Sequence, residues 1–368
     1  MNIFYATFIP GLQNVISDVI RGRLSGARVQ KLLDGAVIFE TETSYDKLNF
    51  FCFNNIFAVI SVLEESQAET RRTCGSRRGD FLESYIKLFI SRNIDFNKDI
   101  IVNNNKKFKT FRIVVSNENT PAAVDPQLRT EAEKVISKIS GLKVNRSLPD
   151  TEFWFLYRRV DNEQFTINDE QKTADKQPRS FSVFMKRLTL RSSWEKTLHK
   201  GELPPPLAWT LCKLAGLVHG DTVLDPFCGY GSIPDAAMKY FHIDKFIACD
   251  NDKAAAAFTV EKFKKRKTGE FVFYQNDFFD LPSLLAEKNI DVIITDPPWG
   301  HFRETDRRFP EKMFDVFFKL LKDNGRAVVL YANDENFLKA VSVRFKTEES
   351  IPILLSGKKA VILSLRKE

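Results

Sequence analysis

The stretch VLDPFCGYGS (residues 223–232) lies between a short apolar strand and a helical segment, and it decides the fold of the C-terminal half. Gly229 and Gly231 allow the backbone to turn sharply and a ligand to approach closely. No Gly-Lys pair follows, which excludes a Walker loop, and the third glycine of a dinucleotide fingerprint is missing. Asp225 would repel a pyrophosphate, so the loop suits a ligand that carries an ammonium and a sulfonium group.

Strand-like and helix-like segments alternate around this loop from about residue 181 onward. DTVLD, FIACD, EFVFYQ, DVIITD and GRAVVLY are separated by helical patterns such as GSIPDAAMKYF. Such a repeat predicts a doubly wound, Rossmann-like parallel sheet. The last two strand candidates, VRFKTEE (343–349) and AVILSLRK (360–367), have no helix between them, so we expect an antiparallel pair at the end of the sheet.

Acidic residues close three successive strands. After Asp225, the next strand ends at Asp250, where a carboxylate can hold a ribose diol. The third strand ends at Asn276 and Asp277, which could reach the edge of an adenine. A plain strand–turn–helix unit is the structural alternative for the first loop, but packing alone does not explain acids at three strand ends.

The fourth strand ends in DVIITDPPWG (residues 291–300). Two prolines fix the backbone and remove donors, which leaves the carbonyl of Pro297 as a directed acceptor. An exocyclic base amine could donate to the Asp296 side chain and to that carbonyl, which turns its lone pair toward an electrophilic methyl group. Trp299 could stack on the base, a contact worth about 1–3 kcal/mol. This predicts methyl transfer by positioning, without a metal; the alternative is a loop with a buried tryptophan.

The N-terminal half contains two α+β segments. Residues 1–62 follow the order βαββαβ of a ferredoxin-like fold, with a hairpin turn at 34–35 and a second helix expected at 44–53. Residues 63–165 contain helical patterns at 81–93 and 126–140, the latter capped by Asp125. A polar stretch without periodicity predicts a linker at 166–185, followed by the α/β domain at 186–368.

Composition limits the class of protein. The 368 residues carry a net charge of +7, which permits an anionic partner such as nucleic acid. No apolar run approaches the roughly 20 residues of a membrane span, and the N-terminus lacks the pattern of a signal peptide. Five scattered cysteines without a CxxC pair argue against a zinc cage and favour a cytoplasmic location.

Basic residues are candidates for phosphate contacts. The pairs at 71–72 and 77–78 and the cluster at 106–109 lie in the N-terminal half, where a solvated face is an equally good explanation for each. HFRETDRRF (301–309) predicts a loop over the substrate, with His301 in a structural or positioning role. We attribute the presence of a cysteine at position 228 to its small size rather than to a role as a nucleophile.

DPFCGYGS, Asp250, Asp277 and DPPWG together resemble class I S-adenosylmethionine-dependent methyltransferases that act on exocyclic amines of bases. Residues 199–232 are similar to the start of the catalytic domain in THUMP-containing RNA guanine-N2 methyltransferases. FIPGLQNVISDVI and LLDGAVIFET resemble the ferredoxin-like unit of that family, and residues 75–160 are similar to a THUMP domain. The resemblance implies a THUMP-like RNA-binding domain at 63–165 that grips the acceptor end of a tRNA substrate.

The resemblance also assigns residues to roles. The S-adenosylmethionine site would comprise Asp225, Pro226, Phe227, Cys228, Gly229, Gly231, Asp250, Asn276 and Asp277, and the target base would be held by Asp296, Pro297, Pro298 and Trp299. Many relatives have asparagine at the first position of this motif and a smaller residue in place of Tyr230.

Because others carry aspartate there, an adenine-N6 or other base amino-methyltransferase acting on rRNA or DNA stays an alternative. A non-catalytic RNA-binding protein with a methyltransferase shell is a second alternative. The sequence leaves the modified nucleotide, the number of methyl groups and the oligomeric state open.

Overall fold

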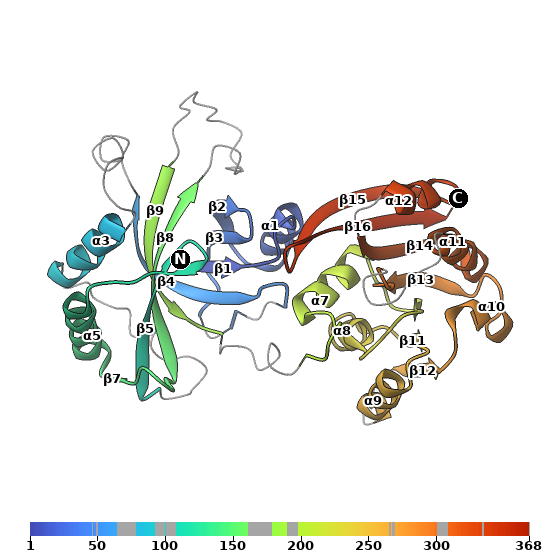
Figure 1. Cartoon of the computed structure of the whole chain (residues 1–368), viewed down its shortest axis with the longest axis horizontal. Helices are drawn as coiled ribbons and strands as arrows, with labels where there is room; N and C mark the ends of the chain where they lie inside the picture. The colour runs from blue at the N-terminus through green and yellow to red at the C-terminus, as the bar shows by residue number, and fades with distance from the viewer. Residues whose placement is uncertain are drawn as a thin grey trace. The chain divides into compact units, whose positions relative to one another are not determined.

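The computed structural model describes residues 1–45, 47–48, 51–64, 79–92, 100, 108–160, 179–189, 198–264, 266, 269–299, 308–332 and 335–367. The chain divides into two compact units, Met1–Phe8 with Gln13–Ser192 and Ile9–Leu12 with Ser193–Glu368 (Figure 1). The predicted phosphate contacts at 71–72, 77–78 and 106–107 and the loop at 301–307 lie outside the described residues.

The first unit is built on one mixed sheet, which contains nine strands among the described residues. Its main path runs β2 (Arg28–Leu33), β3 (Ala36–Thr41), β1 (Asn2–Thr7), β4 (Asn55–Glu64), β9 (Arg179–Arg187), β8 (Thr151–Val160), β5 (Thr110–Asn117) and β6 (Thr120–Pro121), and β7 (Lys143–Val144) pairs with β5. The helices are α1 (Gln13–Arg23), α3 (Gly79–Ser91) and α5 (Pro126–Ser140). Strands from both predicted N-terminal domains therefore share this sheet, and the boundary at residue 62 stays a prediction.

Local sequence signals explain several of these elements. β2 and β3 pair with Leu33 opposite Ala36, which confirms the two-residue hairpin turn. Helix α5 begins where predicted, because the Asp125 carboxylate accepts hydrogen bonds from the amides of Gln127 (2.7 Å) and Leu128 (3.1 Å). It ends at Gly141, whose left-handed backbone (φ 73°) suits glycine.

Two expectations for this unit are wrong. The described residues of the segment 44–53 lie in turns and irregular backbone instead of the expected helix, and its last two residues, Cys52 and Phe53, are buried. The linker expected at 166–185 includes part of a strand, since β9 pairs with β4 and β8. Phe181, Val183 and Met185 alternate along β9 and are buried in the same apolar cluster.

The second unit contains the predicted doubly wound sheet. Its order is β12 (Glu270–Tyr274), β11 (Lys245–Cys249), β10 (Thr222–Asp225), β13 (Ile290–Thr295), β14 (Leu321–Ala332), β16 (Lys358–Lys367) and β15 (Phe345–Leu355). Strands β10 to β14 are parallel, whereas β16 is antiparallel to both β14 and β15, which confirms the antiparallel end. The helices are α7 (Pro205–Leu214), α8 (Ser232–Tyr240), α9 (Lys253–Lys264), α10 (Leu281–Leu284), α11 (Phe309–Leu320) and α12 (Glu335–Ser342).

The strand order places the acidic residues at one edge. β10 lies between β11 and β13, so the strand order reverses its direction at β10. In sheets of this kind, ligands bind at such a switch point, just beyond the carboxyl ends of the strands. Asp225, Asp250, Asp277 and Asp296 all stand at or just after those ends. No helix among the described residues is both long enough and apolar enough to span a membrane.

Candidate active site

Asp225 closes strand β10 and is 1% exposed. One of its oxygens, Oδ1, accepts hydrogen bonds from Thr295 Oγ1 (2.9 Å) and from the amide of Phe227 (3.2 Å). Burial raises the pKa of Asp225, and the nearby carboxylates of Asp250 and Asp296 also raise it, whereas the two hydrogen bonds lower it. The resulting pKa is about 8. A cation bound beside Asp225 would favour its ionised form, and the expectation of a cationic ligand at this residue stays a prediction.

The loop after β10 is held by its neighbours. The amide of Gly229 donates to Asp250 Oδ2 (2.7 Å), and Thr259 of α9 donates to the Gly229 carbonyl (2.9 Å). A Cβ atom on Gly231 (φ +76°) would lie 3.0 Å from Thr259, so this glycine is required by packing and by backbone conformation. A Cβ atom on Gly229 (φ +50°) would meet nothing within 4 Å, which leaves that side of the loop open to a ligand.

The loop after β12 joins the same edge. Asp277 is exposed, and its carboxylate caps a short 3-10 turn (Phe278–Asp280) by accepting from the amide of Phe279 (3.0 Å). The carbonyl of the half-buried Asn276 accepts from Cys249 Sγ (3.3 Å). Phe227 packs on Phe278 with ring centroids 4.6 Å apart, so the loops after β10 and β12 are in direct contact. A role for Asn276 and Asp277 beside an adenine stays a prediction.

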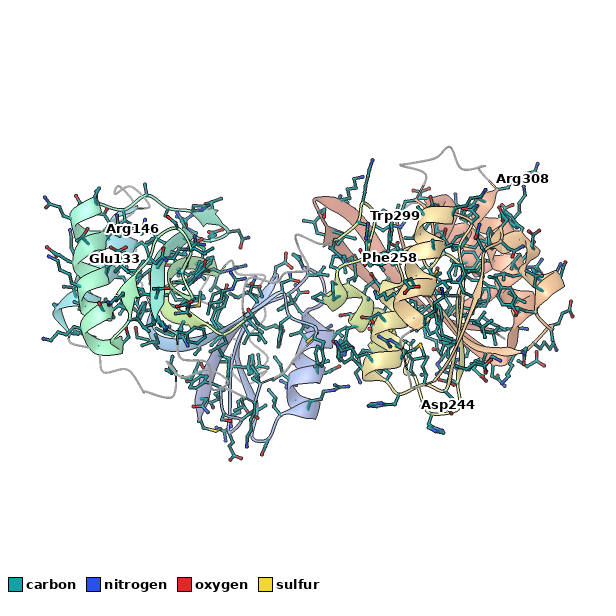
Figure 2. The ribbon with its side chains drawn as sticks, turned by 90° about the horizontal axis from the view of Figure 1, so that it is seen from below. Glu133, Arg146, Asp244, Phe258, Trp299 and Arg308 are labelled. Carbon is teal, nitrogen blue, oxygen red and sulfur yellow. The ribbon has the colours of Figure 1, made fainter. Side chains whose placement is uncertain are left out.

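The DPPW segment follows β13. Pro297 is buried and Pro298 is exposed, whereas Asp296 and Trp299 are half-buried. Trp299, labelled in Figure 2, packs against the apolar core of this unit. Its indole N–H donates to Asp296 Oδ1 (2.8 Å). Burial raises the pKa of Asp296 to about 7, and the hydrogen bond from Trp299 limits that rise. Stacking of Trp299 on a base stays a prediction.

Several residues that contact the site were not predicted from the sequence. Thr295 is fully buried and binds Asp225 across 70 residues of sequence, and the only local signal is a hydroxyl in an otherwise apolar strand end. His199 stacks on Tyr230 in the loop, with ring centroids 3.9 Å apart and planes 5° apart. Glu202 accepts from Ser232 Oγ (3.3 Å), so the segment before α7 lies against the loop.

Cys228 and Pro226 are buried within this loop. Burial raises the pKa of the Cys228 thiol well above its usual range, and the carboxylates of Asp225 and Asp250 raise it further. The thiol is therefore protonated at neutral pH, which agrees with a packing role and not a nucleophilic one.

Comparisons with known proteins identify the family of this chain. Residues 192–352 match the family described as RMKL-like, methyltransferase domain. The tRNA (guanine(10)-N2)-dimethyltransferase of Methanocaldococcus jannaschii is 30% identical over 263 residues, which cover 68% of each chain. The U6 snRNA (guanine-N(2))-methyltransferase THUMPD2 of Bos taurus is 25% identical over 132 residues, which cover 35% of this chain and 26% of that protein.

Among solved structures, TrmN from Thermus thermophilus superposes with a TM-score of 0.73 at 19% identity, and the alignment covers 100% of both chains. This similarity concerns the fold alone.

Proposed function

Because the chain belongs to the THUMP-domain-containing family of class I S-adenosylmethionine-dependent RNA guanine-N2 methyltransferases, we propose that it methylates the N2 amine of a guanosine in tRNA. The observation that carries the proposal is the set of strand ends at which the carboxylates of Asp250 and Asp296 lie close enough to Asp225 to raise its pKa. Residues assigned to the cofactor and to the base thus meet at one edge of the sheet.

The residues present fit S-adenosylmethionine. The open side of Gly229 leaves room beside the loop, and the buried carboxyl of Asp225 favours a positively charged partner. We assign Asp225, Pro226, Phe227, Cys228, Gly229, Gly231, Asp250, Asn276 and Asp277 to this site. When bound, the cofactor supplies an electrophilic methyl group.

The base would be held by the segment after β13. The Asp296 carboxylate accepts one N–H of the guanine amine, the Pro297 carbonyl accepts the other, and Pro298 and Trp299 shape the pocket. Because the pKa of Asp296 is raised to about 7, its carboxylate can also take the proton that the amine loses. Ionised Asp296 is required, so the rate should rise as the pH increases through about 7.

We further propose that the first unit grips the acceptor end of tRNA in the cytoplasm. The net charge of +7 and the THUMP-like segment within that unit support RNA binding, and the named substrate of the archaeal relative supports tRNA. The mammalian relative is named for U6 snRNA, which makes that class of RNA the second candidate.

A labelling experiment tests the proposed function. Purified protein is incubated with labelled S-adenosylmethionine and either bulk tRNA or a U6-type RNA, and the products are digested and separated by mass spectrometry. Label in N2-methylguanosine or N2,N2-dimethylguanosine from tRNA is expected. Label in N6-methyladenosine, or in U6-type RNA alone, would overturn the assignment of the substrate.

Replacing Thr295 with valine should weaken cofactor binding in a pH-dependent way. The substitution removes the hydroxyl that donates to Asp225 and keeps the side-chain shape, so the pKa of Asp225 should rise above about 8. Because ionised Asp225 favours the cation, we expect roughly tenfold weaker binding of S-adenosylmethionine at pH 7 and a smaller loss at pH 9. Calorimetric titration at both pH values measures this, and Thr295→Ser should restore affinity.

A further inference from the structure

The hydrogen bond between Trp299 and Asp296 links two residues that are both assigned to the base. The indole Nε1 lies 2.8 Å from Asp296 Oδ1, and Trp299 is the one side chain that donates to Asp296 among the described residues. We propose that Trp299 is a positioning residue whose indole N–H occupies one oxygen of Asp296, so that the other oxygen receives the substrate amine. The inference rests on the proposed function, and it predicts that residue 296 must be a carboxylate as long as residue 299 is tryptophan.

The number of hydrogen-bond donors and acceptors supports the assignment of one Asp296 oxygen to Trp299 and the other to the substrate amine. An indole offers a single donor and no acceptor, whereas an ionised carboxylate offers two acceptor oxygens. Because Trp299 donates to Oδ1, Oδ2 is the oxygen that would receive the substrate amine. An asparagine at 296 has only one oxygen, and if the indole claims it, an NH₂ group would face the substrate amine, donor against donor.

The local backbone keeps the indole in place. Pro297 and Pro298 lie between the two partners and fix φ at both positions, so the turn that joins Asp296 to Trp299 has little freedom. Trp299 also packs against the buried core of the second unit. The donor is therefore held in position before substrate binds, which lowers the entropy cost of aligning the carboxylate.

Charges around Asp296 make this bond important for ionisation. The carboxylates of Asp296 and Asp250 both raise the pKa of Asp225 at the end of β10, so Asp296 lies in an acidic environment. Burial opposes ionisation of Asp296, whereas the Trp299 N–H favours it. Loss of that donor should therefore raise the pKa of Asp296 above about 7 and make the carboxylate harder to ionise at neutral pH.

The first experiment is Trp299→Phe, which keeps an aromatic ring and removes the N–H. Single-turnover methyl transfer to tRNA is measured from pH 6 to 9 with saturating cofactor and RNA. We expect a rate roughly tenfold lower at pH 7, an acidic limb displaced to higher pH, and a smaller defect at pH 9. A defect of equal size at every pH would show that only stacking or packing was lost, and would overturn the inference.

Trp154→Phe is the matched control, because Trp154 Nε1 donates to the Glu152 carboxylate (3.0 Å) in the first unit. The same chemical change there should leave the pH profile of the single-turnover rate where it is in the parent protein. A displaced profile in Trp154→Phe would show that the effect is not specific to Asp296.

The second experiment is a double-mutant cycle. Asp296→Asn alone should be slower than the double variant Asp296→Asn with Trp299→Phe, because removing the indole frees the single amide oxygen for the substrate amine. Losses that simply multiply would contradict the inference. If the parent protein transfers no methyl group to guanine N2 in any RNA, the proposed function fails instead, so the two failures are distinguishable.

Discussion

Asp296→Ala is expected to slow methyl transfer by about 10²–10³-fold while cofactor binding is retained, because removing one preorganised polar partner of a reacting group typically costs this much. The alanine cannot accept an N–H of the amine or the proton that it loses. Cofactor affinity should not fall, since the Asp296 carboxylate raises the pKa of Asp225 and its removal makes Asp225 easier to ionise. Single-turnover kinetics and calorimetric titration measure the two quantities separately.

Asp291→Ala is the matched control for this variant. Asp291 stands at the other end of strand β13, where it accepts hydrogen bonds from the amide of Thr222 (2.9 Å) and from Lys322 (2.7 Å). Its loss removes an acid from the same strand without changing the site, so the rate of transfer should stay within a few-fold of the parent. Equal rates for Asp296→Ala and the parent protein would refute the role of Asp296.

The part of the site that was predictable follows from strand periodicity. Parallel strands end at one edge, so locating the ends of four strands was enough to bring Asp225, Asp250, Asp277 and Asp296 to the same edge of the sheet. The bond from Thr295 to Asp225 was not predictable, because it depends on the lateral pairing of β10 with β13. The bond from Trp299 to Asp296 spans only three residues, but the sequence shows a ring and not the direction of its N–H.

In the first unit, the errors arose where pairing is non-local. β9 follows a long polar stretch, and its partners β4 and β8 lie more distant in the chain than a local pattern can indicate. The segment 44–53 was misassigned because a short stretch of mixed polar and apolar residues satisfies a helical pattern without forming a helix. By contrast, α5 was predictable because its start and stop signals, Asp125 and Gly141, act locally.

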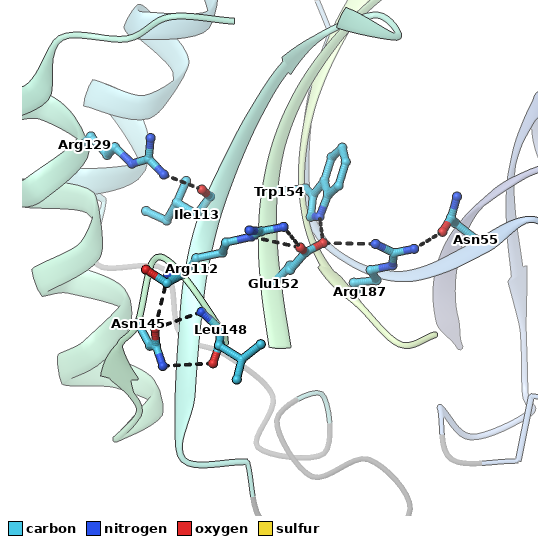
Figure 3. Close-up of polar contacts among 10 residues, drawn as sticks. Asn55, Arg112, Ile113, Arg129, Asn145, Leu148, Glu152, Trp154 and Arg187 are labelled. Atoms are coloured by element: carbon cyan, nitrogen blue, oxygen red, sulfur yellow. Dashed lines mark hydrogen bonds and ion pairs between the residues drawn. The ribbon is translucent and has the colours of Figure 1, made fainter. Parts of the chain in front are cut away.

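A buried charge network crosses four neighbouring strands of this first unit (Figure 3). Glu152 on β8 accepts from Arg112 Nε on β5 (2.9 Å) with one oxygen and from Arg187 Nη1 on β9 (3.1 Å) and Trp154 Nε1 (3.0 Å) with the other. Arg187 also donates to Asn55 on β4. The network thus ties strands of the predicted ferredoxin-like segment to strands of the THUMP-like segment.

Protonation of Glu152 should accompany acid unfolding of this unit. Burial alone would raise the pKa of Glu152, but hydrogen bonds from Trp154 and Arg112 outweigh it and hold the pKa below its ordinary value. A carboxyl whose pKa is lower in the folded state contributes stability above its unfolded pKa and loses it as the pH falls through the folded value. The contribution is therefore complete at neutral pH, where the variants below are compared.

Glu152→Ala is expected to lower the free energy of unfolding of the first unit by about 3–5 kcal/mol, because it breaks a buried ion pair by removing one of its two charges. The side chain of Arg187 is 7% exposed and cannot turn to water without opening the sheet. Urea unfolding at pH 7, followed by tryptophan fluorescence and circular dichroism, measures the loss.

Glu133→Ala separates this mechanism from the simple loss of a buried carboxylate. The Glu133 side chain is 4% exposed and pairs with Arg146 (2.7 Å) and Arg129 (3.5 Å), but the side chains of these arginines are 56% and 36% exposed, so both can regain water when their partner is removed. Glu133→Ala should therefore cost clearly less than Glu152→Ala. Combining Glu152→Ala with Arg187→Met should recover part of the loss, because both charges of the buried pair are then removed. Equal losses of unfolding free energy in the two single variants, with no recovery in the double variant, would mean that the loss comes from cavity formation and not from the broken ion pair.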